Sequence, residues 1–102
     1  MGKNWIYFYI FSFHFTQKGI KDIKKSPARL DAAKQAFQAM GAELKEFYLV
    51  TGTYDAVVIG EVPNDEIVAK LALSIGKQGN IRTETLRAFT EDEYRKIISE
   101  LP

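Results

Sequence analysis

The sequence predicts an α+β fold in which the elements follow one another as strand, helix, strand, strand, helix, strand, with a further helix at the C-terminus. Three observations predict it. An aromatic and β-branched run at residues 5–15 is typical of a strand. In two later segments, apolar residues recur at spacings of three and four, as on one side of a helix. Glycine, proline and asparagine separate these segments, and such residues favour turns and helix ends.

Length and composition fit one globular domain. The chain has 102 residues, and we expect residues 1–102 to form a single domain. Its composition, 46% hydrophobic and 26% charged, is ordinary for a globular protein. A net charge of +1 provides no general attraction to nucleic acid or to an anionic membrane.

The chain contains no cysteine, so neither disulfides nor thiolate metal sites are expected. The apolar run near the N-terminus superficially resembles a signal peptide, but it lacks a small-residue cleavage site. It is also too short to span a bilayer as a helix. We therefore expect a soluble, cytoplasmic protein without a membrane partner.

Residues 5–15 are expected to form a strand that is apolar on both sides. They hold seven of the thirteen aromatic residues, with a ring at every odd position. The even positions are apolar as far as Ile10 and polar at Ser12 and His14. Such a strand should be covered on both of its faces.

The first helical region follows directly. Thr16 can cap a short helical turn within residues 17–25. Ser26 followed by Pro27 then predicts a helix start, with serine at the cap and proline at the first helical position. The buried side of this helix is expected to consist of Leu30, Ala33, Phe37 and Met40.

Two strands, a helix and a last strand come next. Residues 42–50 and 55–62 are expected to be strands joined by a turn. Asn64 or Asp65 caps the following helix, and residues 80–89 form the fourth strand. The apolar side of the helix is expected to consist of Val68, Leu71, Ala72 and Ile75.

The terminal helix begins with a capping box. Thr90 and Glu93 are three residues apart, a spacing at which each side chain bonds the other residue's backbone amide. One side of the helix is expected to be apolar, formed by Tyr94, Ile97, Ile98 and Leu101.

This order of elements is that of the ferredoxin-like split βαβ arrangement. Both inner helices would cover one face of the sheet and leave the other face open. A second copy of the chain is the simplest cover for that face. We therefore predict a ferredoxin-like βαββαβ domain with a C-terminal helix that forms a homodimeric α/β barrel, with larger oligomers left open.

Three segments carry a family resemblance: GTYD at residues 52–55, KKSPARLDAAKQAFQAMGAELKEFYLVTG before it, and GNIRTETLRAFTEDEYRKII after the second helix. Together they resemble the GYD domain family of small bacterial and archaeal proteins, over nearly the whole chain from about residue 16. The resemblance implies a dimeric ferredoxin-like α/β barrel and no settled biochemical role. The first strand is more aromatic than is usual in the family, so a pocket built against it is expected to differ in shape from those of relatives.

The GTYD segment has two interpretations. In the first it is a hairpin turn, in which Gly52 accepts a positive φ, Asp55 bonds local backbone amides and the ring of Tyr54 packs over the sheet edge. In the second, Tyr54 and Asp55 also form the rim of a ligand pocket. Asp55 would there orient or deprotonate a ligand group.

His14 is the only histidine, and we expect it near Tyr54, Asp55 and the fourth strand, because the first strand of this fold is central. Imidazole can shuttle a proton or bind a ligand near neutral pH. The alternative is an ordinary hydrogen-bonded or solvated side chain. One histidine with scattered carboxylates is a poor metal set, and we predict neither a metal nor a cofactor.

The fourth strand carries Thr83 and Thr85 on one face and Arg82 on the other. The β-propensity of threonine and weak surface ion pairs explain this pattern without a function. Alternatively, the threonines line a cavity and Arg82 holds an anionic or carbonyl-bearing ligand. Nucleic acid is not an expected partner, because the third strand lacks the aromatic rings of an RNA recognition motif.

The leading functional prediction is a homodimeric module that binds or senses a small apolar or aromatic molecule. The alternative is a small cofactor-free enzyme of monooxygenase or isomerase type acting on aromatic or polyketide-like compounds, by analogy between folds. A purely structural role of the assembly is a third possibility. The predicted ligand contacts are His14, Tyr54, Asp55, Arg82, Thr83 and Thr85.

Overall fold

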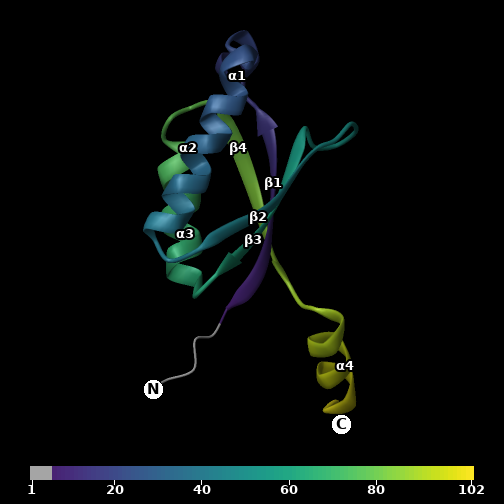
Figure 1. Cartoon of the computed structure of the whole chain (residues 1–102). Coiled ribbons are helices and arrows are strands. Elements are labelled where there is room, and N and C mark those ends of the chain that lie inside the picture. The colour runs from purple at the N-terminus through teal and green to yellow at the C-terminus, as the bar shows by residue number, and fades with distance from the viewer. Residues whose placement is uncertain (1–5) are drawn as a thin grey trace.

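Strands and helices follow one another in the predicted order in the computed structural model, which describes residues 6–102 (Figure 1). Trp5, predicted to belong to the first strand, lies outside the described residues. The strands are β1 (Tyr7–Phe15), β2 (Glu43–Leu49), β3 (Ala56–Val62) and β4 (Ile81–Ala88). The helices are α1 (Gln17–Lys21), the 3-10 turn η1 (Ile23–Lys25), α2 (Ser26–Ala39), α3 (Asp65–Gly76) and α4 (Glu91–Ser99).

The four strands form one antiparallel sheet in the order β2-β3-β1-β4. β1 is therefore central, as predicted, although it is the first strand in the sequence. Its register sets Phe11 opposite Val58 on one side and opposite Thr85 on the other. The strand order and the two inner helices confirm the predicted α+β, ferredoxin-like fold.

Helices α2 and α3 cover one face of the sheet (Figure 1), and the core lies between them and the odd-numbered side chains of β1. Phe37 of α2 and Leu71 of α3 are almost fully buried there. The ring of Phe37 meets that of Phe11 edge-on, with 5.4 Å between the centroids. Both rings lie over Gly60 of β3, where an added Cβ would come within 3.0 Å of each of them. The core therefore requires glycine at this position.

The other face of the sheet has no cover within the described chain, and we call it the open face. Phe8 and Ile10 of β1 are half-buried on it, because their strand neighbours shield them partly. Leu86 of β4 and Tyr48 of β2 are more than half exposed. The sequence predicted that both faces of β1 are covered. Within the described chain, α2 and α3 cover one face, and the other face stays open.

Three helix starts agree with the predicted caps. The hydroxyl of Thr16 accepts a hydrogen bond from Gly19 N at the start of α1, at 3.1 Å. The side chain of Asn64 accepts one from Ile67 N at 2.9 Å and so begins α3. At α4, the capping box of Thr90 and Glu93 has both of its expected hydrogen bonds.

The predicted cap at Ser26 is wrong. Ser26 has helical backbone angles and its side chain makes no capping hydrogen bond. The physical reason is that η1 continues directly into α2, so that Lys25 occupies the cap position and a partly helical turn already precedes it. Pro27 still lies in the first turn of α2, where its missing N–H costs no hydrogen bond.

α4 stands apart from the rest of the fold. It lies beyond the end of the sheet opposite to α1, on the side away from α2 and α3 (Figure 1), and it makes little contact with the other elements. In the described part of the chain, no helix has the length and apolar character needed to cross a membrane. The apolar side of α4 is exposed and consists of Tyr94, Ile97 and Ile98, and Leu101, just beyond the helix, is exposed as well.

Candidate functional site

The GTYD segment is the turn between β2 and β3. Gly52 has a backbone φ of +117°, a value that residues other than glycine rarely adopt. The turn interpretation is therefore correct at this position. The side chain of Asp55 bonds the backbone of β1 and not the amides of its own turn. Its side chain accepts a hydrogen bond from Phe15 N at 2.9 Å, and its own N–H donates to Phe13 O at 3.0 Å. Asp55 thus fixes the β2–β3 hairpin to the central strand.

Tyr54 joins a polar cluster on the open face. Its ring lies against that of His14, with 5.1 Å between centroids, and its hydroxyl donates to Glu84 Oε1 at 2.6 Å. This hydrogen bond, followed by burial and the negative charge of Glu84, raises the pKa of Tyr54 above its usual value. Arg82 lies opposite His14 in the register of β1 and β4. We call His14, Tyr54, Arg82 and Glu84 the His14 cluster.

Thr83 and Thr85 lie on the other face. In the register they pair with Phe13 and Phe11, whose rings point toward the helices. The six predicted ligand contacts are therefore not brought into one site. His14, Tyr54 and Arg82 gather on the open face, Asp55 is a backbone clamp, and the two threonines belong to the covered face.

A cavity of about 120 Å³ lies on the covered face, between the sheet and helices α2 and α3. Thr83 is the one predicted contact that lines it. Alanines of the two helices stand opposite the rings of the sheet, and short side chains facing large ones leave the space open. The apolar part of the lining includes Phe11, Phe13, Phe15, Phe47, Leu30, Ala33, Ala36, Ala72 and Ile75.

The polar groups of this cavity are few. Arg29 is the ionisable side chain among its lining residues, and its guanidinium donates to the carbonyls of Gly19 and Asp22 at 3.3 and 3.2 Å. Among the described residues, no carboxylate or imidazole lines the space. The cavity can therefore hold an apolar body and offer it neutral hydrogen-bonding partners, but it supplies no obvious proton acceptor. The neutral polar residues of the lining are Ser26, Ser74, Gln78, Asn80 and Thr83.

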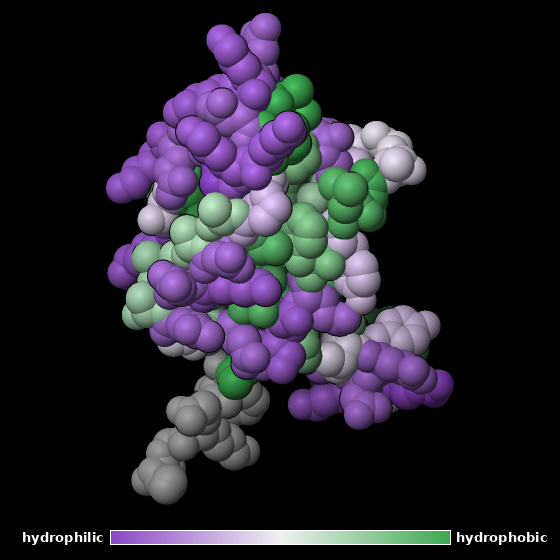
Figure 2. Space-filling view, turned by 45° about the horizontal axis from the view of Figure 1, so that its top comes forward, coloured by the Kyte–Doolittle hydropathy of each residue, from purple (hydrophilic) through white to green (hydrophobic). Residues whose placement is uncertain are grey.

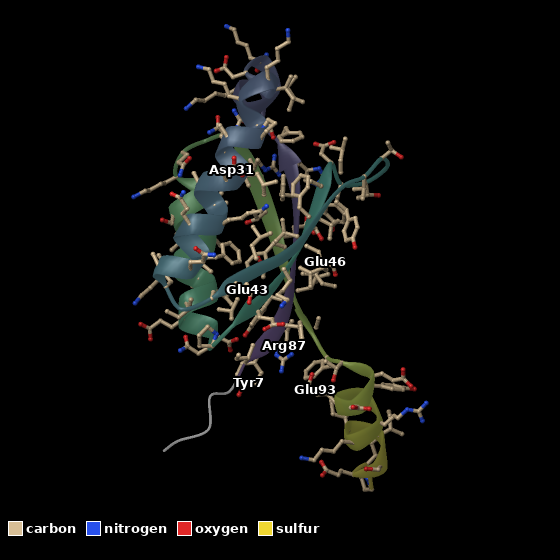
Figure 3. The ribbon with its side chains drawn as sticks, in the orientation of Figure 1. Tyr7, Asp31, Glu43, Glu46, Arg87 and Glu93 are labelled. Atoms are coloured by element: carbon tan, nitrogen blue, oxygen red, sulfur yellow. The ribbon has the colours of Figure 1, made fainter. Side chains whose placement is uncertain are left out.

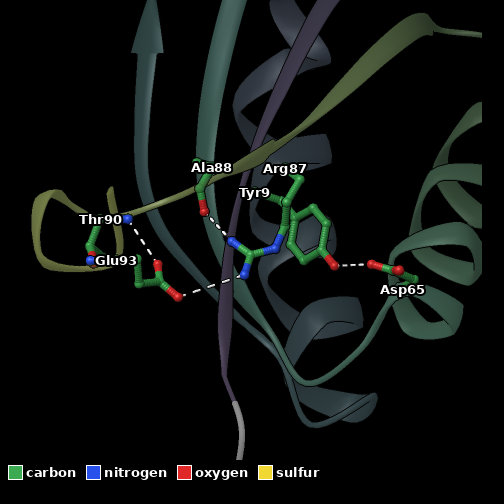
Figure 4. A network of polar contacts seen from close by, with 6 residues as sticks. All are labelled: Tyr9, Asp65, Arg87, Ala88, Thr90 and Glu93. Atoms are coloured by element: carbon green, nitrogen blue, oxygen red, sulfur yellow. Dashed lines mark hydrogen bonds and ion pairs between the residues drawn. The ribbon is translucent and has the colours of Figure 1, made fainter. Parts of the chain in front are cut away.

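A second polar network joins β4 to α4 (Figures 3 and 4). The guanidinium of Arg87 lies 4.5 Å from the ring centroid of Tyr7 and 4.3 Å from that of Phe89. It also donates to the carbonyl of Ala88 and forms an ion pair with Glu93 at 3.7 Å. The backbone amide of Thr90, more than the charge of Arg87, lowers the pKa of Glu93.

Tyr9 extends this network toward α3, where its hydroxyl donates to Asp65 (Figure 4). Burial of the ring, and then the hydrogen bond to Asp65, raise the pKa of Tyr9 to about 12. The phenol therefore stays neutral at physiological pH and serves as a donor. Within residues 6–102, no three histidine, aspartate or glutamate side chains are grouped so that they could hold a metal ion.

Residues 9–98 match the GYD domain family. A Thermus thermophilus protein named glutamine synthetase and cystathionine beta-lyase binding protein is 30% identical over 74 residues, which is 72% of this chain and 78% of the relative.

Two solved structures from Mycobacterium tuberculosis have a similar fold. They are a leucine response regulatory protein, with a TM-score of 0.62, and a feast or famine regulatory protein complexed with L-methionine, with a TM-score of 0.63. Each is 17% identical, and the match covers 82% of this chain. This chain spans about half of theirs, 51% and 50%, and the likeness concerns the fold alone.

Proposed function

Because this chain belongs to the GYD domain family and holds an apolar cavity between its sheet and its helices, we propose that it is a homodimeric module that binds or senses a small apolar or aromatic molecule. The cavity is the observation that carries the proposal. Its volume of about 120 Å³ is of the order of cavities that accept a single aromatic ring.

The lining of the cavity favours binding over catalysis. Rings and aliphatic groups surround the space, and the neutral hydroxyls and amides lie among them. General acid–base chemistry needs a titrating group within hydrogen-bond reach of the substrate, and the cavity-lining residues include no carboxylate and no imidazole. His14, which the sequence suggested could shuttle a proton or bind a ligand, lies on the opposite face of the sheet.

A fold relative supports a small-molecule ligand. The feast or famine regulatory protein of similar fold is complexed with L-methionine, so this type of sheet and helix layer occurs in a protein that binds a metabolite. At 17% identity the support is an analogy between folds and identifies no ligand for this chain.

The open face supports the homodimer. It carries Phe8 and Ile10 in its centre and Leu86 toward the β4 edge, and no other element of the described chain lies over it. A second copy related by a two-fold axis would cover both open faces at once with the same residues. Apolar faces of this kind are typical of protein–protein contact surfaces.

The ligand prediction is tested with cavity-filling substitution. Small aromatic acids and ketones are screened by thermal shift, and we expect at least one of them to raise Tm. In Ala36→Leu the larger side chain occupies the cavity, so the rise in Tm should disappear while the variant still folds. Tyr54→Phe, on the open face, is the matched control and should respond like the wild type. A ligand effect that is lost in Tyr54→Phe and kept in Ala36→Leu would move the site to the His14 cluster.

Attachment to a metabolic enzyme is a second candidate function. It is favoured by the 30% identical relative, which is named for binding glutamine synthetase and cystathionine beta-lyase. Sedimentation of the purified chain with each of these two enzymes tests it. Cosedimentation is the expected result, and independent sedimentation at micromolar concentrations would exclude a stable complex.

A further inference from the structure

α4 has an apolar side that no other element of the described residues covers. Tyr94 is 57% exposed, Ile97 42% and Ile98 49%, although the helix is strongly amphipathic. A helix of nine residues is only marginally stable in water without packing against another surface. Its capping box stabilises the first turn and its exposed Glu91–Arg95 ion pair adds less, but neither covers the apolar side of the helix. α4 therefore needs a surface to pack against.

The start of α4 is held in a fixed direction by the rest of the chain. The guanidinium of Arg87 lies against the rings of Tyr7 and Phe89. It also forms an ion pair with Glu93 in the first turn of the helix (Figure 4). These contacts direct α4 away from α2 and α3, so the helix cannot fold back on the core without breaking them. Within residues 6–102, therefore, no surface is placed to cover the apolar side of α4.

A matching surface lies at the other end of the molecule, on α1 and η1. Ile20 is 54% exposed and Ile23 is 39% exposed, so this segment also carries an apolar patch without a cover. Figure 2 shows hydrophilic side chains gathered at this end with hydrophobic atoms beside them. The basic residues of the segment are Lys18, Lys21, Lys24 and Lys25.

The two patches have opposite charge. Residues 17–25 contain four lysines and one aspartate, a side-chain charge of +3. Residues 90–102 contain four acidic and two basic side chains, a charge of −2. Apolar centres with complementary charged borders favour a specific contact between the two segments. The segments lie at opposite ends of one chain, so the contact can form only between two copies.

We propose that α4 of one copy packs against α1 and η1 of a second copy, and that the reciprocal contact forms at the same time. Let the two open faces pack against each other, related by a two-fold axis that lies between the sheets and runs perpendicular to the strands. The strands of the two copies then run in opposite directions, so the α4 end of one copy lies beside the α1 end of the other. Because α4 lies on the side of the open face (Figure 1), it can reach that end of the second copy. The inference rests on the proposed homodimer and assigns to it a second, clamp-like contact outside the paired sheets.

A charge exchange tests the contact by analytical ultracentrifugation. Lys21→Glu/Lys24→Glu makes the α1 segment acidic, and Asp92→Lys/Glu100→Lys makes α4 basic. Each variant alone should dimerise at least tenfold more weakly than the wild type, because like charges then face each other. An equimolar mixture should regain the wild-type affinity, since its mixed dimer restores attraction at both contacts. Lys34→Glu/Lys70→Glu, on α2 and α3, changes the net charge by as much as the first variant does, so it is the control for that variant and should dimerise normally.

Cross-linking tests the same contact independently. The chain has no cysteine, so a single introduced cysteine can form a disulfide only from its own position. A mixture of Ile20→Cys and Ile98→Cys should form a disulfide-linked dimer on oxidation. Either variant alone should not, because the two copies of one position lie at opposite ends of the dimer.

The outcomes separate this contact from the proposed function. A wild-type dimer whose charge-exchanged mixture stays as weak as its components would overturn the α4 contact and leave the homodimer and the ligand prediction standing. A wild-type chain that sediments as a monomer would overturn the homodimer and the contact together, while thermal shift still reports on the ligand. If α4 variants keep the dimer and lose an enzyme partner, α4 binds that partner and the contact proposed here is wrong.

Discussion

Asp55 shows how one side chain can organise two distant parts of the chain. The residue directly precedes β3, yet its carboxylate accepts a hydrogen bond from the backbone amide of Phe15 at the end of β1. Its backbone also bonds Val50 and Phe13, so one residue joins β1, β2 and β3. The acidic residue of the GTYD segment therefore has a structural task that needs no ligand.

We expect Asp55→Ala to lower the free energy of unfolding by about 1 to 3 kcal/mol, because the amide of Phe15 loses its partner in a partly buried place. Asp55→Asn keeps an acceptor oxygen and should lose less than half as much. Urea denaturation of both variants measures the difference. Equal stability of Asp55→Ala and the wild type would show that water replaces the carboxylate, and would revive the pocket-rim interpretation.

Replacement by alanine should change the free energy of unfolding differently at two glycines. At Gly60 an added Cβ meets the rings of Phe11 and Phe37, so Gly60→Ala should destabilise the fold by about 1 to 3 kcal/mol through overpacking. At Gly76, in α3, a Cβ meets nothing within 4 Å. Gly76→Ala should be neutral or stabilise by up to about 1 kcal/mol, through helix propensity. Thermal unfolding of the two variants makes the comparison, and a stable Gly60→Ala would mean that the two rings move apart easily.

Among the elements, helix α4 depends most on its own local sequence. The other long helices gain stability from burial, since Phe37 in α2 and Leu71 in α3 are core residues. α4 buries no residue within the chain and begins with a complete capping box. Its order within a single copy therefore rests on the cap and on the contacts of Arg87 with Glu93.

Thr90→Ala should accordingly unfold α4 locally and leave the core intact. The loss of the hydroxyl removes the bond to Glu93 N, and a lost N-cap costs a helix about 1 kcal/mol. Amide hydrogen exchange should then accelerate in residues 91–99 and stay unchanged in β1. Thr53→Ala, in the exposed turn, is the control. Unchanged exchange in α4 would mean that other contacts hold the helix in place.

The sequence predicted most elements because their signals are local. Caps, glycines and the spacing of apolar residues lie within a few positions of the features they specify, and Thr16, Asn64 and Thr90 all act as predicted. Ser26 failed as a cap because a neighbouring element, η1, runs into α2. A local pattern does not reveal whether the preceding residues are already helical.

The sequence predicted the grouping of the candidate site residues less well than the elements. That grouping depends on the register between strands and on which side chains lie on the same face of the sheet. The sequence placed His14 near Tyr54 correctly, since the central position of β1 follows from the fold. It did not identify Glu84 as the partner of Tyr54, although the alternation along β4 puts Glu84 on the same face as Arg82. The cavity was missed because it arises from alanines of two helices meeting rings of the sheet, a relation between distant segments.

At the scale of the whole molecule, the structure is a thin plate whose Cα positions extend 50 × 35 × 19 Å. The short dimension corresponds to one sheet and one helix layer, about 10 Å apart. Such a plate protects the sheet on one side only. The homodimer would turn two plates into a four-layer assembly with both sheets inside.

Leu86→Lys should therefore weaken dimerisation at least tenfold, because it places a charge in the paired open faces. Leu73→Lys is a matched control, since Leu73 is also an exposed leucine but lies on α3 in the opposite layer. Sedimentation velocity over a range of concentrations measures both dissociation constants. Equal values for the two variants would exclude the open face as the contact surface between copies.

The central place of β1 also has a consequence for biosynthesis. This strand leaves the ribosome first, but its two neighbours, β3 and β4, end only at Val62 and Ala88. At synthesis rates of 5 to 20 residues per second, its aromatic side chains wait on the order of 4 to 15 s for the last neighbour. An unpaired, ring-rich strand is prone to aggregation during that interval. A nascent chain of this protein should therefore be most prone to aggregation in the interval before its final strand has emerged.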